Sequence, residues 1–270
     1  MSAVAQRLGK YISKKEAESA LLAALEQRSK EGTLHPESQD YFEGSYDRWS
    51  LVIGELSKAP SGGRILDIGA WDGLFCCGLK KLGYETAAVD WYKPIDEAVW
   101  QKLGIEWHQC NIEADLLPFP DCEFSGVYMG QLMEHFTYSP RKPLQEIKRV
   151  LKAGGLLVID APNVGELHNF YRLIRGKNIL WDYKKHYIDA EPIFYKGLPY
   201  FDRHNREFTA NDLRVLAESC GFEVVRTAYI RSARHGLKGF RRFEIPFTYL
   251  RDLIPLFRKS VMLVARKCVK

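Results

Sequence analysis

Short apolar runs alternate with amphipathic stretches along the middle of the chain. The runs cover residues 65–68, 86–90, 105–110, 124–129 and 156–159. Between them, apolar residues recur at the three- and four-residue spacing of a helix that is buried on one face. Strands that alternate with helices in this way are typical of a doubly wound α/β fold built on a parallel sheet.

Two further amphipathic stretches precede this repeating pattern. Residues 14–30 and 39–58 carry apolar side chains at helical spacing, and Ser13 with Glu16 predicts a capping box at the first helix. A Pro-Ser-Gly-Gly break at residues 60–63 ends the second. We therefore expect an N-terminal helical segment, residues 1–59, followed by one main domain, residues 60–270.

The pattern continues near the C-terminus. A helix is predicted over residues 210–219, with Thr209 as its cap, and a strand over residues 223–230. Residues 247–257 predict a helix interrupted by Pro255, and residues 260–265 a last apolar strand. These two strands bring the expected sheet to seven.

Residues 163–208 interrupt the alternation of strands and helices. The segment holds ten aromatic side chains together with His168, His186 and His204. An insertion after the fifth strand lies over the edge where parallel strands end, and long loops there are often functional. We expect a substrate cap, and the alternative is a packed insertion without ligand contact.

The stretch from Arg64 to Phe75 predicts a ligand site. Its strand runs into a turn bracketed by Gly69 and Gly73, and a helix follows. Glycine permits positive φ and close approach of a ligand to the backbone, and the first N–H groups of a helix are free to bind it. A tight strand–helix connection without a ligand would show the same residues.

Asp90 supports the ligand hypothesis because it ends the second strand. Ligands of open parallel sheets bind beyond the carboxyl ends of the strands. A carboxylate at this place can accept both hydrogen bonds of a ribose diol, although it can equally cap the next helix.

The turn resembles motif I of class I S-adenosylmethionine-dependent methyltransferases, (D/E)-x-G-x-G-x-G. Asp67, Gly69 and Gly73 match it, and Trp71 stands where the middle glycine is usual. Residues 118–136 resemble the L-P-F-x-D-x-x-F-D-x-V…E-H segment of the small-molecule, type 11-like branch, with Ser125 in place of an Asp. The resemblance covers residues 60–162 and 205–267. It implies a Rossmann-like sheet of seven strands, order 3-2-1-4-5-7-6, with strand 7 antiparallel.

The resemblance also implies S-adenosyl-L-methionine as the cofactor. Asp67 would approach its methionine amino group, Asp90 its ribose and Ile112 its adenine. Asn111 takes the place of a frequent Asp beside the adenine, and Glu113 is a substitute for that contact. The expected cofactor-binding set is Asp67, Gly69, Ala70, Trp71, Gly73, Asp90, Trp91, Asn111, Ile112, Glu113 and Gln131.

Histidines are the candidate catalytic residues, because a hydroxyl acceptor has to lose a proton during methyl transfer. His135 is the first candidate for general base, since imidazole titrates near neutral pH. His186 and His204 in the cap are alternatives, and a structural role for His135 stays open. No metal site is expected, because the six cysteines show no zinc spacing with histidine.

The net charge of +5 is concentrated near the C-terminus, where Arg226 to Lys270 holds twelve Lys or Arg against Glu244 and Asp252. Such a region suits an anionic or lipid-linked substrate, or is simply a solvated face. Nucleic acid is not favoured as a partner, because no N/D-P-P-Y/F tetrapeptide occurs.

Scattered cysteines and no evident signal peptide or membrane span predict a cytoplasmic protein, with a peripheral position at a membrane left open. The oligomeric state is not predicted.

These features predict a methyltransferase that uses S-adenosylmethionine, with O-methylation of a small-molecule, glycan or natural-product acceptor favoured. One alternative is an oxidoreductase with a nucleotide cofactor, against which the lack of G-x-G-x-x-G argues. Another is a non-catalytic S-adenosylmethionine-binding protein, suggested by the departures at Trp71, Asn111 and Ser125.

Overall fold

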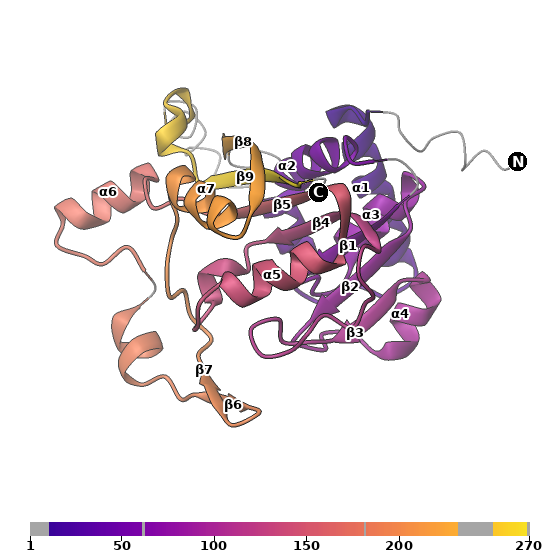
Figure 1. Ribbon diagram of the computed structural model, residues 1–270. Helices are drawn as coiled ribbons and strands as arrows, with labels where there is room; N and C mark the ends of the chain where they lie inside the picture. Colours follow the sequence, from indigo (N-terminus) through magenta and orange to yellow (C-terminus); the bar gives the residue numbers. More distant parts are fainter. Residues whose placement is uncertain (1–10, 61–62, 181, 232–250, 269–270) are drawn as a thin grey trace, which may run out of the picture.

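The computed structural model describes residues 11–60, 63–180, 182–231 and 251–268 and contains a seven-stranded sheet (Figure 1). Its order is β3-β2-β1-β4-β5-β9-β8, and only β9 runs antiparallel to its neighbours. The strands are β1 (Arg64–Ile68), β2 (Thr86–Asp90), β3 (Glu106–Gln109), β4 (Phe124–Gly130), β5 (Leu151–Pro162), β8 (Phe222–Ile230) and β9 (Ser260–Lys267). The predicted fold class and strand order are therefore confirmed.

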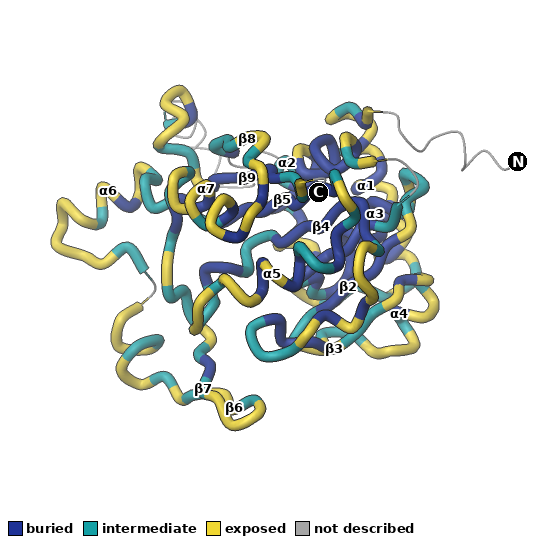
Figure 2. The backbone as a smooth tube through the Cα atoms, viewed as in Figure 1, coloured by how far each residue is buried: buried dark blue, intermediate teal, exposed yellow. Residues whose placement is uncertain are grey.

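Helices cover both faces of the sheet and form two cores. One core packs α5 (Arg141–Val150) and α7 (Ala210–Ser219) against one face. The other packs α1 (Lys14–Lys30), α2 (Ser38–Leu56), α3 (Leu74–Lys81) and Trp100 of α4 (Glu97–Leu103) against the opposite face. The tube in Figure 2 shows the central strands as mostly buried, as expected for parallel strands covered on two sides.

Local sequence explains where several helices begin. Ser13 and Glu16 form the predicted capping box at α1, and Thr209 with Asp212 forms another at α7. Each box satisfies backbone N–H groups that a first turn leaves without intrahelical partners. In the described parts of the chain, no helix has both the length and the apolar content needed to cross a bilayer.

Two predicted elements differ from the structure. The strand expected over residues 156–159 begins earlier, at Leu151, and in this added part the pairing of β5 with β4 shifts register and Gly154 has a φ of 73°. The glycine absorbs this irregularity without ending the strand. The helix predicted over residues 247–257 falls partly outside the described residues, and its end is a 3-10 turn, η4 (Pro255–Phe257).

The predicted cap follows β5 and consists of three short pieces: α6 (Leu167–Ile174), η2 (Lys184–Ile188) and a hairpin of β6 (Ile193–Tyr195) with β7 (Leu198–Tyr200). Figure 1 shows the hairpin extending away from α6. The Tyr195 hydroxyl donates to Asp115 Oδ2 at 2.6 Å, and the Tyr138 hydroxyl donates to the Pro199 carbonyl at 2.9 Å. These bonds tie the hairpin to the loops that follow β3 and β4.

Candidate active site

A cavity of about 490 Å³ lies at the carboxyl ends of β1, β2 and β4. Its lining includes eight of the eleven predicted cofactor residues (Gly69, Trp71, Asp90, Trp91, Asn111, Ile112, Glu113 and Gln131). The volume falls within the ~300–1,000 Å³ range of small-molecule sites. Sequence reasoning missed other lining residues, among them Tyr41, Leu132, Phe136, Tyr200, Phe201 and Asp202.

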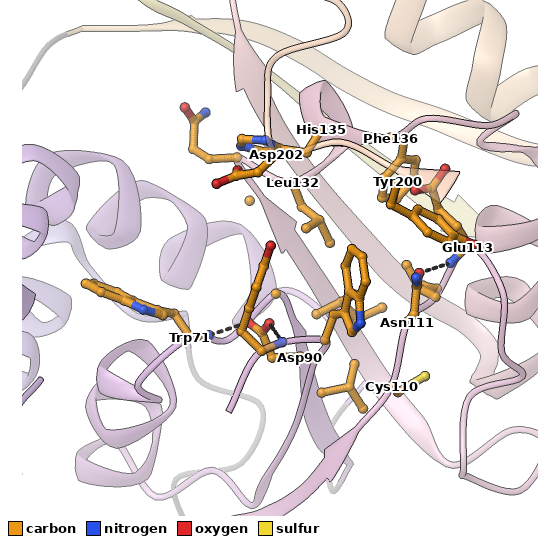
Figure 3. Close-up of a pocket in the computed structure, with 18 of the residues that line it drawn as sticks. Trp71, Asp90, Cys110, Asn111, Glu113, Leu132, His135, Phe136, Tyr200 and Asp202 are labelled. Carbon is orange, nitrogen blue, oxygen red and sulfur yellow. Dashed lines mark hydrogen bonds between the residues drawn. The ribbon is translucent and has the colours of Figure 1, made fainter. Parts of the chain in front are cut away.

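Asp90 lies at the centre of the cavity wall in Figure 3. Its two carboxylate oxygens accept backbone N–H groups from Trp71, at 2.8 Å, and Tyr92, at 2.9 Å. Burial raises the pKa of Asp90, and these two hydrogen bonds oppose the shift. Each oxygen keeps a further lone pair, so the carboxylate can still accept from a diol in the cavity.

Trp71 takes a left-handed conformation, with a φ of 46°, where the family motif has glycine. Its ring lies 5.0 Å from His35 and 5.1 Å from Tyr41, both measured between ring centroids. Figure 3 shows the ring directed away from Asn111 and Tyr200. The side chain therefore anchors the segment that begins α2 at one end of the cavity.

The opposite end of the cavity is formed by Asn111, Glu113 and Tyr200 (Figure 3). Asn111 Oδ1 accepts the Glu113 N–H at 3.0 Å, and the carboxylate of Glu113 accepts the backbone N–H groups of Thr137 and Tyr138. Within the described residues, the buried Asn111 Nδ2 and Tyr200 hydroxyl are adjacent but lack a well-formed hydrogen bond. A buried amide N–H without a well-formed hydrogen bond fits a ligand that offers a ring nitrogen as acceptor.

The three candidate histidines differ in their relation to the cavity. His135 lines it, and the ring of His204 lies 4.8 Å from that of His135, measured between centroids. Neither His204 nor His186 is among the lining residues. Burial lowers the pKa of His135 and lowers that of His204 to about 4. Both imidazoles are therefore held in the neutral form at neutral pH.

Part of the chain is similar in sequence to known methyltransferases. Residues 66–159 match the family model of a methyltransferase domain. The demethylmenaquinone methyltransferase of Clavibacter sepedonicus is 30% identical over 118 residues, which cover 43% of this chain and 48% of that protein. The ubiquinone/menaquinone biosynthesis C-methyltransferase UbiE of Blochmanniella floridana is 29% identical over 126 residues, with 43% and 49% covered.

A solved structure extends the likeness beyond the matched segment. The 1,6-didemethyltoxoflavin-N1-methyltransferase of Burkholderia thailandensis, solved with 1,6-didemethyltoxoflavin and S-adenosylhomocysteine, has a TM-score of 0.53 at 17% identity. The alignment covers 92% of this chain and 89% of that one, and it is a likeness of fold. Over residues 66–159 the chain is therefore similar to methyltransferase domains. It spans about half the length of the curated relatives that it matches.

Three of the predicted cofactor residues lie outside the main cavity. Asp67 and Ala70 line a separate void of about 20 Å³ that Tyr41 and Trp49 of α2 close. Gly73 has a φ of 74°, and a Cβ there would come within 2.4 Å of the Trp100 ring. The glycine is therefore required by the packing of the turn on α4 as well as by its conformation.

A buried polar network that sequence reasoning missed lies beside the cavity and includes Gln131 of its lining. Asp160 is fully buried in β5 and accepts from the Tyr128 hydroxyl at 2.7 Å and from Gln131 Nε2 at 2.8 Å. Arg48 of α2 completes it, with Nε 3.3 Å from Asp160 Oδ1. The visible signal was an Asp inside an apolar strand, since such a group needs partners when buried.

Proposed function

We propose that this chain is an enzyme that transfers a methyl group from S-adenosylmethionine to a small, ring-bearing acceptor. The observation that supports the proposal most is the cavity, in which Asp90, Asn111 and Gln131 from successive strand ends face one space. The cofactor supplies an activated methyl group on a sulfonium. The protein then mainly has to align donor and acceptor, which can contribute on the order of 7–11 kcal/mol.

The residues present fit this cofactor at its nucleoside end. Asp90 offers oxygen lone pairs for the ribose hydroxyls, and the buried Asn111 Nδ2 offers a donor to a ring nitrogen of adenine. Ile112 and Trp91 supply apolar and aromatic walls. Asp67, Gly69, Ala70 and Gly73 stay the proposed methionine-end residues, with Gln131 near the reacting methyl group.

The proposed acceptor enters from the side of the cavity that carries His135, Phe136 and Leu132. Apolar and aromatic walls suit a ring, which agrees with the predicted substrate cap over residues 163–208. Oxygen is the methylated atom in our proposal. Carbon is the alternative, favoured by the names of the curated relatives, and mass and NMR analysis of the product would distinguish them.

We also propose His135 as the residue at which the acceptor is deprotonated. It is the one of the three predicted histidines that lines the cavity, and its imidazole is kept neutral by burial. His204 acts through His135 in this arrangement, and His186 has no part in it.

Calorimetry with S-adenosylhomocysteine tests the proposal directly. We expect saturable binding that Asp90→Asn weakens, and no comparable binding of NAD(H). Stabilisation by NAD(H) alone would support the oxidoreductase alternative. Binding of S-adenosylhomocysteine without turnover on any hydroxylated ring compound would support a non-catalytic protein.

The basic C-terminal region enters the proposal as a surface that attracts an anionic or lipid-linked acceptor to a cytoplasmic enzyme. Residues 232–250 lie outside the described residues, so the sequence alone supports this part. Co-sedimentation with vesicles of anionic and of neutral lipid would test a peripheral position at a membrane, with binding to the anionic vesicles expected.

A further inference from the structure

Three potential metal ligands from two distant segments meet beside the cavity. Glu134 and His135 belong to η1 (Met133–His135), just after β4, and His204 lies on the segment that returns from the hairpin. Among the described residues, the ligand atoms of these three side chains lie within 4.8 Å of one another.

Hydrogen bonds fix the positions of the two segments relative to each other. The Asn205 backbone N–H donates to the Glu134 carbonyl at 2.7 Å, and Asn205 Nδ2 donates to the His135 carbonyl at 3.1 Å. The Tyr187 hydroxyl donates to the His204 carbonyl from the cap. The position of His204 beside η1 is therefore fixed by its neighbours and does not depend on contact between the two rings.

Glu134 supplies the independent observation that points to a ligand. Its side chain is 1% exposed, and within the described part of the chain Oε2 has no hydrogen-bond partner. The nearby cation, Arg48, is already paired with Asp160, while Glu207 and Asp202 add negative charge around the cluster. A buried carboxylate oxygen without a partner is unfavourable, and a bound cation would satisfy it.

We propose that Glu134, His135 and His204 bind a divalent transition-metal ion. Two imidazoles and one carboxylate favour Zn²⁺, Mn²⁺, Fe²⁺ or Co²⁺ over Mg²⁺ and Ca²⁺, which prefer oxygen ligands alone. The His135 ring is also hydrogen-bonded to the Arg203 main chain, an arrangement that commonly orients metal-bound histidines. The sequence expectation of no metal site rested on cysteine and histidine spacing, which does not detect ligands so far apart in the chain.

The role of the ion, unlike its binding, rests on the proposed function. With the ion bound, His135 serves as a metal ligand and no longer as the general base. The ion then faces the cavity and binds the acceptor hydroxyl oxygen, which makes that hydroxyl more acidic. The O–H bond breaks and its proton leaves to water. An oxygen electron pair then forms the bond to the methyl carbon, while the C–S electron pair stays on sulfur and yields S-adenosylhomocysteine.

Titration of the full chain with Co²⁺, after removal of bound metals by a chelator, tests the site. We expect one Co²⁺ per chain, detected by its visible absorption and displaced by Zn²⁺. Glu134→Gln and His204→Ala should each weaken Co²⁺ binding by about tenfold or more. His168→Ala, at an exposed position on α6, is the matched control and should bind like the native chain.

Thermal unfolding of each variant first establishes that it is folded, and Zn²⁺ should raise the Tm of the native chain and of His168→Ala more than that of Glu134→Gln or His204→Ala. Uptake of Co²⁺ that neither variant weakens would overturn the proposal. A chain that binds S-adenosylhomocysteine but no Co²⁺ would overturn the ion site and leave the proposed function standing. Co²⁺ binding at the cluster without S-adenosylhomocysteine binding would support the site and refute the proposed function.

Discussion

At the scale of single residues, Asp90 has a structural task beside the cofactor contact proposed for it. Its oxygens accept the backbone N–H groups of Trp71 and Tyr92, so it fixes the loops on either side of the cavity. Trp71 adopts its left-handed φ within the same turn and turns its ring towards His35 and Tyr41. The polar wall of the cavity is thus held in shape by the backbone before any ligand arrives.

Asp90→Asn should therefore lower cofactor affinity more than the loss of one charge suggests. The new NH₂ group cannot accept a backbone N–H, so either the Trp71 or the Tyr92 hydrogen bond is lost. Hydrogen bonds to charged groups contribute about 1.5–3 kcal/mol, which predicts a loss of roughly tenfold or more in S-adenosylhomocysteine affinity by calorimetry. Asp121→Asn, an exposed control, should bind like the native chain. Equal affinities for all three proteins would contradict the role given to Asp90.

His135→Ala should separate catalysis from cofactor binding. The side chain lines the cavity, so under the proposed function its loss removes the group at which the acceptor is deprotonated. We expect kcat to fall by about 10²–10⁴-fold with little change in S-adenosylhomocysteine affinity. His168→Ala serves as the control with native kcat. An unchanged kcat in His135→Ala would remove this residue from the mechanism.

At the scale of elements, the docking of α2 decides the form of the cavity. Arg48 reaches from α2 to the fully buried Asp160 of β5, and its Nη2 donates to Ser45 at 2.9 Å. Tyr41 and Trp49 of the same helix close the small void above Asp67. The N-terminal helices are thus part of the site and not merely a cover for the sheet.

Arg48→Ala should destabilise the whole fold, because it leaves the Asp160 carboxylate buried without its cation. Breaking a buried pair from one side costs about 3–5 kcal/mol. The free energy of unfolding, measured in urea, should fall by that amount. Lys58→Ala removes an ion pair with Glu55 in which the lysine is 46% exposed, and it should change stability by less than about 1 kcal/mol. Similar losses in the two variants would show that Arg48 is not a buried partner.

The elements themselves could be predicted well from the sequence, and their contacts could not. Apolar runs specify buried strands, and the residues Ser13 and Thr209 mark helix starts, because these signals are local. The pairing of Arg48 with Asp160, and of His204 with Glu134 and His135, joins segments far apart in the chain. The predicted insertion did not reveal that Tyr200 and Phe201 would turn into the cavity, because a run of aromatics has no local period that fixes its direction.

At the scale of the whole molecule, buried carboxyl groups make stability depend on pH. Burial raises the pKa of Asp67 to about 8 and that of Glu207 to about 7, well above their values in an unfolded chain. The native state therefore binds more protons than the unfolded state across this interval. It follows that these groups contribute their full stability below about pH 4 and lose it progressively as the pH rises through 7 and 8.

Asp67→Asn tests this dependence, because an amide fills nearly the same space and cannot ionise. The Cys76 thiol, with Sγ 3.6 Å from Asp67 Oδ2, can still donate to the amide oxygen. In urea unfolding, the loss of unfolding free energy between pH 5 and pH 8 should be smaller in Asp67→Asn than in the native chain by at least about 1.4 kcal/mol, which corresponds to one pKa unit. Asp121→Asn, whose carboxylate is 74% exposed, should keep the native slope. Parallel slopes for Asp67→Asn and the native chain would mean that Asp67 is ionised inside the fold, and that a cation lies near it in solution.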